Sequence, residues 1–238
     1  MVPVQFTGGP LKSAGWQSLE PMGDQGVIIR FATEEKALAW ARVARRQLAW
    51  EIVPAYRAVA VYAPLTDVGF DTLTASLALV LPQSGPIPGR RVEIPCCYRL
   101  GPDLTECAEL LKMTPEDLEK LHASTEYKVY AIGFVPGFPY MGWLPDAITG
   151  IDRLESPRTQ VPPGSVGITG RQTGIYPAEV PGGWRLIGKT PCMLVDLAAG
   201  ESGWFALAPG DRVRFRPIHE IDFDRLNGSH PTVLEPNP

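Results

Sequence analysis

The sequence predicts an α+β protein with two domains, a small mixed α/β domain over residues 1–88 and a β-rich domain over residues 89–238. Two observations predict this division. In the first ninety residues or so, strand patterns alternate with helix patterns. From about residue 133 helix signals vanish, and short apolar stretches are separated by Gly and Pro turns, which favours a barrel or a sandwich.

The first part of the chain, to about residue 95, has the element order strand-helix-strand-strand-helix-strand, which is the ferredoxin-like pattern. Its strands are short runs rich in β-branched residues: "GVIIRF" (26–31), two runs in "EIVPAYRAVAVYAP" around a turn near 54–57, and "RRVEIP" (90–95). The first helix, "EEKALAWARVARRQLAW" (34–50), follows Thr33 and places acidic residues early and arginines late, which suits the helix dipole. The second helix is "FDTLTASLALVL" (70–81), with Asp71 as its cap.

Two short helices and a strand follow. "GPDLTECAELL" starts a helix at Pro102–Asp103, and "TPEDLEKLH" has Thr114 as its cap with Pro115 at the first helical position. We interpret Asp103, Glu116 and Asp117 as helix-capping residues rather than as a general acid–base pair. "YKVYAIGF" (127–134) alternates as a strand does. Four later apolar stretches predict further strands: 165–168, 184–187, 192–195 and 213–215.

Composition narrows the functional classes. An apolar content of 45% with 20% charged residues is typical of a globular protein. The net charge of −4 and the lack of a basic stripe argue against a nucleic-acid partner. No apolar run reaches the roughly 18 residues of a membrane span, and the first residues lack a secretory signal pattern. We therefore expect a cytoplasmic protein without a membrane partner.

The four cysteines have no zinc-site spacing, and adjacent cysteines do not readily pair. They are Cys96, Cys97, Cys107 and Cys192. Inert thiols in a reducing compartment are the simpler interpretation. A nucleophilic cysteine is the alternative, for which His122 is the one histidine in the middle of the chain, since His219 and His230 lie near its end.

Two irregular segments, "GFVPGFPYMGWLP" (133–145) and "PPGSVGITGRQTGIYPAEVPGGWRLIGKTP" (162–191), combine aromatic residues with glycines and prolines. A concave apolar site with a few polar groups is typical of small-molecule binding. The alternative, that tight turns need the glycines and the aromatics fill a small barrel, stays open. The segments lack the frame of a nucleophile elbow and of a phosphate-binding loop. In and near them lie these ionisable and polar residues: Arg158, Arg171, Glu179, Arg185, Lys189, Ser165, Thr169, Gln172, Thr173, Tyr176 and Thr190.

"GFVPGFPYMG", "PRTQVPPGSVGITGRQTGIYP" and "VPGGWRLIGKTP" resemble the signature blocks of the family of 5-oxoprolinase B subunits (PxpB), also called the KipI or allophanate hydrolase subunit 1 family. The likeness runs from "GDQGVIIRF" to "RFRPI". "CYRLGPDL" departs from the family pattern by lacking a glutamate, and "GWLPDAITGIDRLESPRT" differs beside the predicted pocket.

The resemblance implies a cyclophilin-like β-barrel after a smaller α/β domain. It implies a non-autonomous subunit of a bacterial ATP-dependent 5-oxoprolinase, which opens 5-oxoproline to glutamate. The partner would be the C-type subunit of that enzyme, of the KipA or allophanate hydrolase subunit 2 type, with a further, A-type subunit. ATP would be a co-substrate of the assembly, without a tightly bound cofactor. Two alternatives are inhibition of a sensor histidine kinase and, from barrel fold alone, prolyl isomerisation.

We predict that ten residues bind a small carboxylate or lactam, and we assign neither catalytic nor metal-binding residues. Phe138 and Tyr140, with Phe134, would line a groove beside the barrel. Arg158 would hold the carboxylate, so that Arg158→Ala weakens binding about tenfold to a hundredfold at nearly unchanged stability. The ten residues are Phe138, Tyr140, Arg158, Ser165, Gln172, Thr173, Tyr176, Trp184, Lys189 and Thr190.

Overall fold

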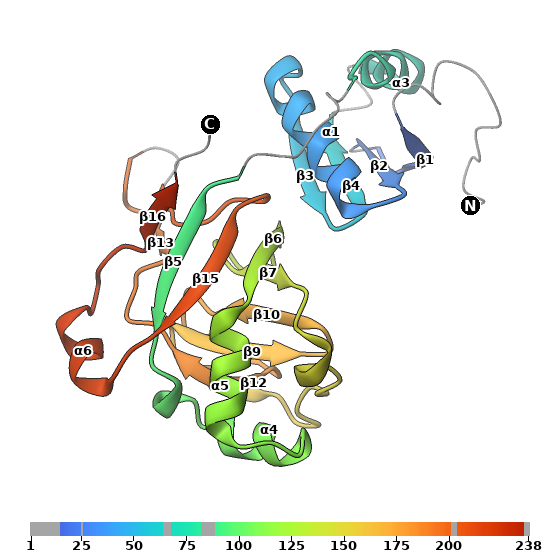
Figure 1. Cartoon of the computed structure of the whole chain (residues 1–238). Coiled ribbons are helices and arrows are strands. Elements are labelled where there is room, and N and C mark those ends of the chain that lie inside the picture. Colours follow the sequence, from blue (N-terminus) through green and yellow to red (C-terminus); the bar gives the residue numbers. More distant parts are fainter. Residues whose placement is uncertain (1–14, 25, 64–67, 82–88, 201–203, 236–238) are drawn as a thin grey trace. The chain divides into compact units, whose positions relative to one another are not determined.

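The computed structural model describes residues 15–24, 26–63, 68–81, 89–200 and 204–235, which form two compact units, 1–87 and 88–238 (Figure 1). Both units combine helices with sheets, so the mixed α/β composition is confirmed. Within the described ranges no helix is both long enough and apolar enough to cross a membrane.

The first unit is a four-stranded antiparallel sheet in the order β1-β2-β4-β3, covered by two helices (Figure 1). Trp40 and Phe31 lie in its core, with ring centroids 5.8 Å apart. The elements are β1 (Trp16–Pro21), β2 (Gly26–Phe31), α1 (Glu34–Gln47), β3 (Glu51–Ala55), β4 (Ala58–Tyr62) and α3 (Phe70–Ala78).

The strand predicted at 90–95 is confirmed, but its assignment to this sheet is wrong, because the segment belongs to the second unit. There β5 (Arg91–Cys96) pairs in parallel with β15 (Arg212–Pro217). The first unit instead takes its fourth strand, β1, from the N-terminal side of the chain. The sequence of β1 gives little strand signal, because Leu19 is its one buried residue.

Local signals explain the bounds of the helices. The Thr33 hydroxyl accepts a hydrogen bond from the Lys36 N–H at 3.3 Å, which confirms the expected start of α1. The helix ends three residues earlier than predicted, because Leu48 is extended. Asp71 is not the cap of α3, since Gly69 occupies that position and Asp71 lies in the first turn.

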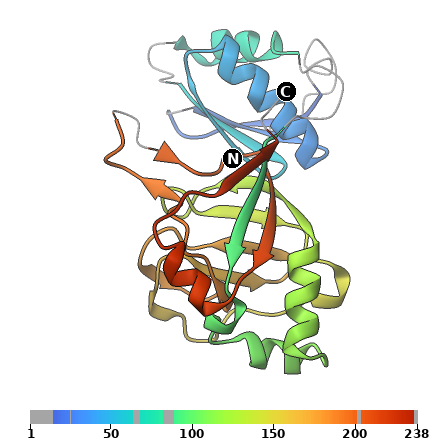
Figure 2. The same ribbon diagram turned by 60° about the vertical axis from the view of Figure 1, so that its left-hand side comes forward.

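The second unit contains an eight-stranded, strongly curved sheet in the order β12-β9-β10-β7-β6-β15-β5-β16 (Figures 1 and 2). Its two sides meet at an isolated bridge between Cys97 and Lys189, without a continuous ladder that closes it in the described part of the chain. Its further strands are β6 (Glu126–Ile132), β7 (Pro139–Gly142), β9 (Ser165–Thr169), β10 (Gln172–Ile175), β12 (Arg185–Lys189) and β16 (Thr232–Glu235).

Two small two-stranded sheets accompany it, β8 (Arg158–Val161) with β11 (Val180–Gly182) and β13 (Val195–Asp196) with β14 (Trp204–Phe205). The strand expected at 192–195 is therefore wrong except for its last residue. The others expected at 165–168, 184–187 and 213–215 are confirmed within one or two residues.

Helices of the second unit pack against the curved sheet, and α5 and α6 flank the β5–β15 pair in Figure 2. Thr114 caps α5 as predicted, accepting a hydrogen bond from the Asp117 N–H at 3.1 Å. Helix α6 lies beyond residue 133, where no helix was expected. The helical elements are η2 (Tyr98–Leu100), α4 (Leu104–Leu110), α5 (Pro115–Ser124), η3 (Asp146–Ile148) and α6 (Glu220–Arg225).

Candidate functional site

The first irregular segment begins with a tight turn between β6 and β7 that presents Phe134 to solvent. Backbone hydrogen bonds close the turn, from Val135 N–H to the Gly133 carbonyl at 2.8 Å and from Phe138 N–H to the Val135 carbonyl at 3.1 Å. Phe134 has a φ of +68°, which L-residues with a large side chain rarely adopt, and its side chain is 59% exposed. A strained backbone that holds an aromatic ring in solvent points to recognition.

Beneath Phe134, an aromatic cluster is centred on Phe138, which is fully buried. The ring centroids of Tyr140, Tyr176 and Trp184 lie 4.9, 5.1 and 5.5 Å from that of Phe138, all edge-to-face. Phe134 stands over the cluster, 5.5 Å from Phe138. Edge-to-face pairs stabilise such a cluster beyond the burial of apolar area. Phe138 therefore anchors the segment, and the expectation that it lines the wall of a groove is wrong.

Arg158 is paired within the protein. Its Nη2 lies 2.6 Å from Asp103 Oδ1, and Asp103 Oδ2 accepts a hydrogen bond from the Leu186 N–H at 2.7 Å. Asp103 occupies the N-cap position of α4 without capping the helix, so its interpretation as a capping side chain is wrong. Arg158 therefore has a structural partner, because the Asp103 side chain is 7% exposed and ties α4 to β8 and β12.

A second ion pair lies one helical turn along α4, where Arg185 Nη1 is 2.6 Å from Glu106 Oε2. Buried N–H groups of both arginines, Nη1 of Arg158 and Nε of Arg185, have no acceptor among the described residues. Burial, and next the Asp103 charge, raise the pKa of the Cys107 thiol to about 12. Such a thiol is not a nucleophile at neutral pH, which favours the inert interpretation of the cysteines.

Sequence reasoning missed Arg153. Burial raises the pKa of the Tyr140 and Tyr176 hydroxyls, and the charge of Arg153 opposes that rise at both rings. The Arg153 side chain is exposed and makes no ion pair with the described residues. Its neighbour Leu154 ties this segment to the chain beside Trp184, because the Leu154 N–H donates a hydrogen bond to the Gly183 carbonyl at 2.8 Å. Arg153 is thus a cation at the aromatic cluster that no carboxylate of the described ranges neutralises.

A second group of predicted residues surrounds Gly164. The Ser165 hydroxyl donates to the Pro162 carbonyl at 2.7 Å, and Thr190 accepts from the Cys192 N–H at 3.2 Å. Lys189 lies opposite Ser165 in the β9–β12 pair, with its Nζ 5.7 Å from the ring centroid of Phe223. The two buried hydroxyls, on Ser165 and Thr190, stabilise turns.

Thr173 belongs to a buried polar chain. Its hydroxyl donates to the Gly167 carbonyl at 3.1 Å, so its oxygen accepts from His122 Nε2 at 2.9 Å. His122 Nδ1 then accepts from the Tyr98 hydroxyl at 2.7 Å. Burial lowers the pKa of His122 to about 3, which keeps the ring neutral. Gln172, the other predicted residue on β10, pairs opposite Gly142 at the far end of that strand from Tyr176.

The structure therefore brings five predicted residues together at the aromatic cluster, namely Phe138, Tyr140, Arg158, Tyr176 and Trp184. It places Ser165, Lys189 and Thr190 around Gly164, and Thr173 in the interior. No group of three or more His, Cys, Asp or Glu in the described ranges could hold a metal ion. In the part of the chain that the structure describes, Ser165 and His122 have structural partners and do not form a nucleophile–base pair. The arrangement suits binding.

A family model, "Carboxyltransferase domain, subdomain C and D", matches residues 17–205. The match spans both structural units. The chain belongs to this carboxyltransferase-domain family. Membership agrees with the resemblance of its sequence blocks to the B subunits of 5-oxoprolinase.

Related proteins fit this family. The B subunit of 5-oxoprolinase from Bacillus subtilis (strain 168) is 47% identical over 136 residues, which cover 56% of this chain and about half, 55%, of that protein. The urea amidolyase of Lachancea kluyveri is 32% identical over 139 residues, covering 54% of this chain and 8% of that protein. The solved structure of TTHA0988 is 34% identical with a TM-score of 0.74, covering 82% of this chain and 40% of that one.

Proposed function

We propose that this carboxyltransferase-family chain is the B-type subunit of an ATP-dependent 5-oxoprolinase that opens 5-oxoproline to glutamate. The observation that carries the proposal is the 47% identity to a protein named as the B subunit of 5-oxoprolinase. In this proposal the chain acts with a C-type subunit, of the KipA or allophanate hydrolase subunit 2 type, and with an A-type subunit. ATP is a co-substrate of the assembly. We further propose that the second unit is a cyclophilin-like barrel and that the protein is cytoplasmic.

The need for partners has two supports. The matching segment makes up 8% of urea amidolyase and 40% of TTHA0988, so related chains carry it beside much other sequence. In addition, Ser165 and His122 have structural partners within the described part of the chain and do not form a nucleophile–base pair. These observations favour an enzyme subunit over the alternative of a histidine-kinase inhibitor.

The proposal is tested by co-expression with a C-type subunit from the same organism. The two proteins should co-elute as a stable complex that buries more than about 1,000 Å². The isolated chain should show no turnover of 5-oxoproline, with or without ATP. Separate elution of two folded proteins at micromolar concentration, or robust turnover by the single chain, would contradict it.

Phe134→Asp should weaken that complex by about 2 kcal/mol or more, because an exposed aromatic ring held by a strained turn has the character of an interface anchor. The melting temperature should fall only slightly, since the ring is 59% exposed and its contacts with the protein are edge-to-face contacts with Phe138 and Tyr176. The matched control is Leu110→Asp, at a leucine on α4 that is 58% exposed. Calorimetric titration of each variant with the partner subunit measures the affinity of the complex. Equal effects of the two variants would show that Phe134 has no special role.

Arg153→Ala should raise the KM of the assembled enzyme for 5-oxoproline about tenfold to a hundredfold, because Arg153 is a cation at the aromatic cluster without an ion pair in the described ranges. Its exposure predicts unchanged thermal stability, in contrast to Arg158. The control is Arg99→Ala, at an exposed arginine without an ion pair in the described structure. An unaltered KM in Arg153→Ala would place the carboxylate contact elsewhere.

A further inference from the structure

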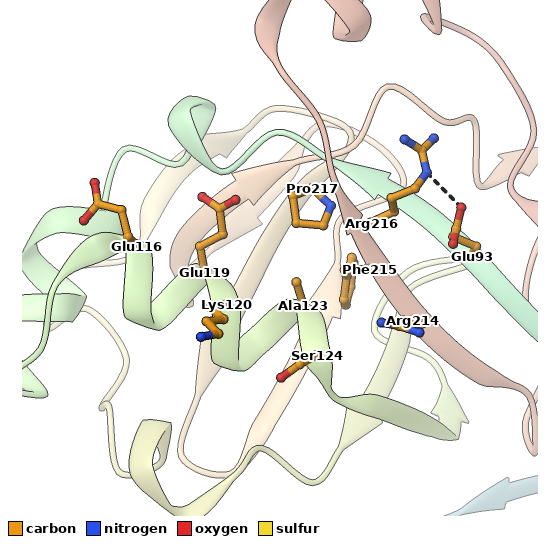
Figure 3. Close-up of a pocket in the computed structure, with 10 residues that line it drawn as sticks. All are labelled: Glu93, Glu116, Glu119, Lys120, Ala123, Ser124, Arg214, Phe215, Arg216 and Pro217. Atoms are coloured by element: carbon orange, nitrogen blue, oxygen red, sulfur yellow. Dashed lines mark hydrogen bonds and ion pairs between the residues drawn. The ribbon is translucent and has the colours of Figure 1, made fainter.

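A groove of about 620 Å³ lies between α5 and β15, and none of the ten predicted residues lines it (Figure 3). The helix contributes one continuous face, at positions 116, 119, 120, 123 and 124. Ala123 and Phe215 form an apolar floor, where the small alanine leaves room between helix and strand. The volume is that of a small-molecule site.

One side of the groove is acidic. Glu116 and Glu119 extend from α5, and the Glu119 carboxylate points toward Pro217 (Figure 3). Glu119 is half-buried, and neither carboxylate forms an ion pair with the described residues. Burial, and next the Glu116 charge, raise the pKa of Glu119. A cation placed here would relieve the repulsion between the two carboxylates.

The opposite end of the groove carries Arg214, whereas Lys120 follows Glu119 directly in α5. Lys120 points away from Glu119, and Arg214 lies beyond Ser124 (Figure 3). Neither Lys120 nor Arg214 forms an ion pair within the described ranges, whereas Arg216, on the groove wall, is held by Glu93 at 2.8 Å. An anion placed beside Arg214 would meet positive charge that no ion pair with the described residues neutralises, together with the Ser124 hydroxyl.

The separation of the two sides sets the length of a ligand. Glu119 and Glu116 precede Ser124 by five and eight residues, or about 7 to 12 Å along the helix axis at about 1.5 Å per residue. An extended chain advances about 3.3–3.6 Å per residue, so two or three residues span this distance. The ammonium and carboxylate groups of a single amino acid lie too close together to reach both ends of the groove.

We propose that this groove binds a di- or tripeptide with free termini. The ammonium group lies at Glu116 and Glu119, the carboxylate lies at Ser124 and Arg214, and the peptide crosses the floor formed by Ala123 and Phe215. The groove is independent of the proposed 5-oxoprolinase site, so either proposal can fail without the other.

The test is calorimetric titration of the full chain with trialanine, N-acetyl-trialanine and trialanine amide. Trialanine should bind at millimolar concentration or below, and blocking either terminus should weaken binding about tenfold. Glu119→Gln and Arg214→Gln should each weaken trialanine binding by the same factor. The matched controls are Glu109→Gln on α4 and Arg225→Gln on α6, both exposed and outside the groove.

Thermal melts check that each variant is folded, and the blocked peptides test the proposal on the unaltered protein. Absence of trialanine binding at millimolar concentration would overturn the proposal. If trialanine amide binds as tightly as trialanine, the groove recognises only the ammonium group. If N-acetyl-trialanine binds as tightly as trialanine, the groove recognises only the carboxylate. Either result, or unchanged binding in both groove variants, would overturn it as well.

Discussion

Asp103→Ala is expected to lower the free energy of unfolding by about 3–5 kcal/mol, the typical cost of removing one partner of a buried ion pair. The carboxylate is 7% exposed and joins three elements, through Arg158 Nη2 at 2.6 Å and the Leu186 N–H at 2.7 Å. Its loss leaves a largely buried guanidinium and a buried N–H without acceptors. Urea denaturation measures the change.

Glu109→Ala is the matched control, because Glu109 lies on the same helix and is exposed. Its effect should stay within about 0.5 kcal/mol. Arg158→Ala should also destabilise the protein, and the double variant should lose clearly less than the sum of the two single variants. Additive losses, or a loss below about 1 kcal/mol in Asp103→Ala, would contradict the anchoring role of Asp103.

Lowering the pH is expected to lower the free energy of unfolding of the second unit, because His122 is buried as a neutral ring. The folded pKa of about 3 lies below the ordinary value of 6.5, so the folded state binds fewer protons than the unfolded state between these values. The contribution of His122 is therefore complete above pH 6.5 and declines as pH falls toward 3. At about 1.4 kcal/mol per pH unit, the total loss is about 4–5 kcal/mol.

Denaturation curves at pH 7 and pH 4.5 for the unaltered protein and for His122→Gln measure this contribution. The unaltered protein should lose about 2–3 kcal/mol more between these pH values than the variant does. His219→Gln is the control, at an exposed histidine, and should keep the pH dependence of the unaltered protein. Identical pH dependence in His122→Gln would show that His122 is not buried as a neutral ring.

Local chemistry explains where the sequence predicted well. Thr33 and Thr114 were recognised as caps because a capping side chain bonds to a backbone group only three residues away. The strands around Val166, Ile187 and Phe215 were recognised because continuous apolar runs between Gly and Pro turns are a local pattern.

Long-range pairing explains what was missed. A short strand does not show its partner, so "RRVEIP" was assigned to the first sheet, although it pairs with β15 more than a hundred residues later. Likewise, Asp103 precedes Arg158 by 55 residues, and nothing near either residue indicates the ion pair. His122 was considered as a partner for a cysteine, whereas its neighbours are Tyr98 and Thr173.

The candidate site was predicted in part. The aromatic segment was correctly singled out as unusual, but whether a ring lies inside or outside a tight turn depends on backbone conformation. The positive φ of Phe134 turns that ring to solvent, while Phe138 is buried. Arg153 carried no signal, because its significance arises from the approach of Tyr140 and Tyr176, which come from two other segments.

The most direct test of the proposed function is turnover of 5-oxoproline by the chain reconstituted with its C-type and A-type partners. The account predicts formation of glutamate that requires ATP and all three proteins, with no product from the chain alone. Reconstitution into a stable complex that forms no glutamate with ATP, under conditions where each protein is folded, would contradict it.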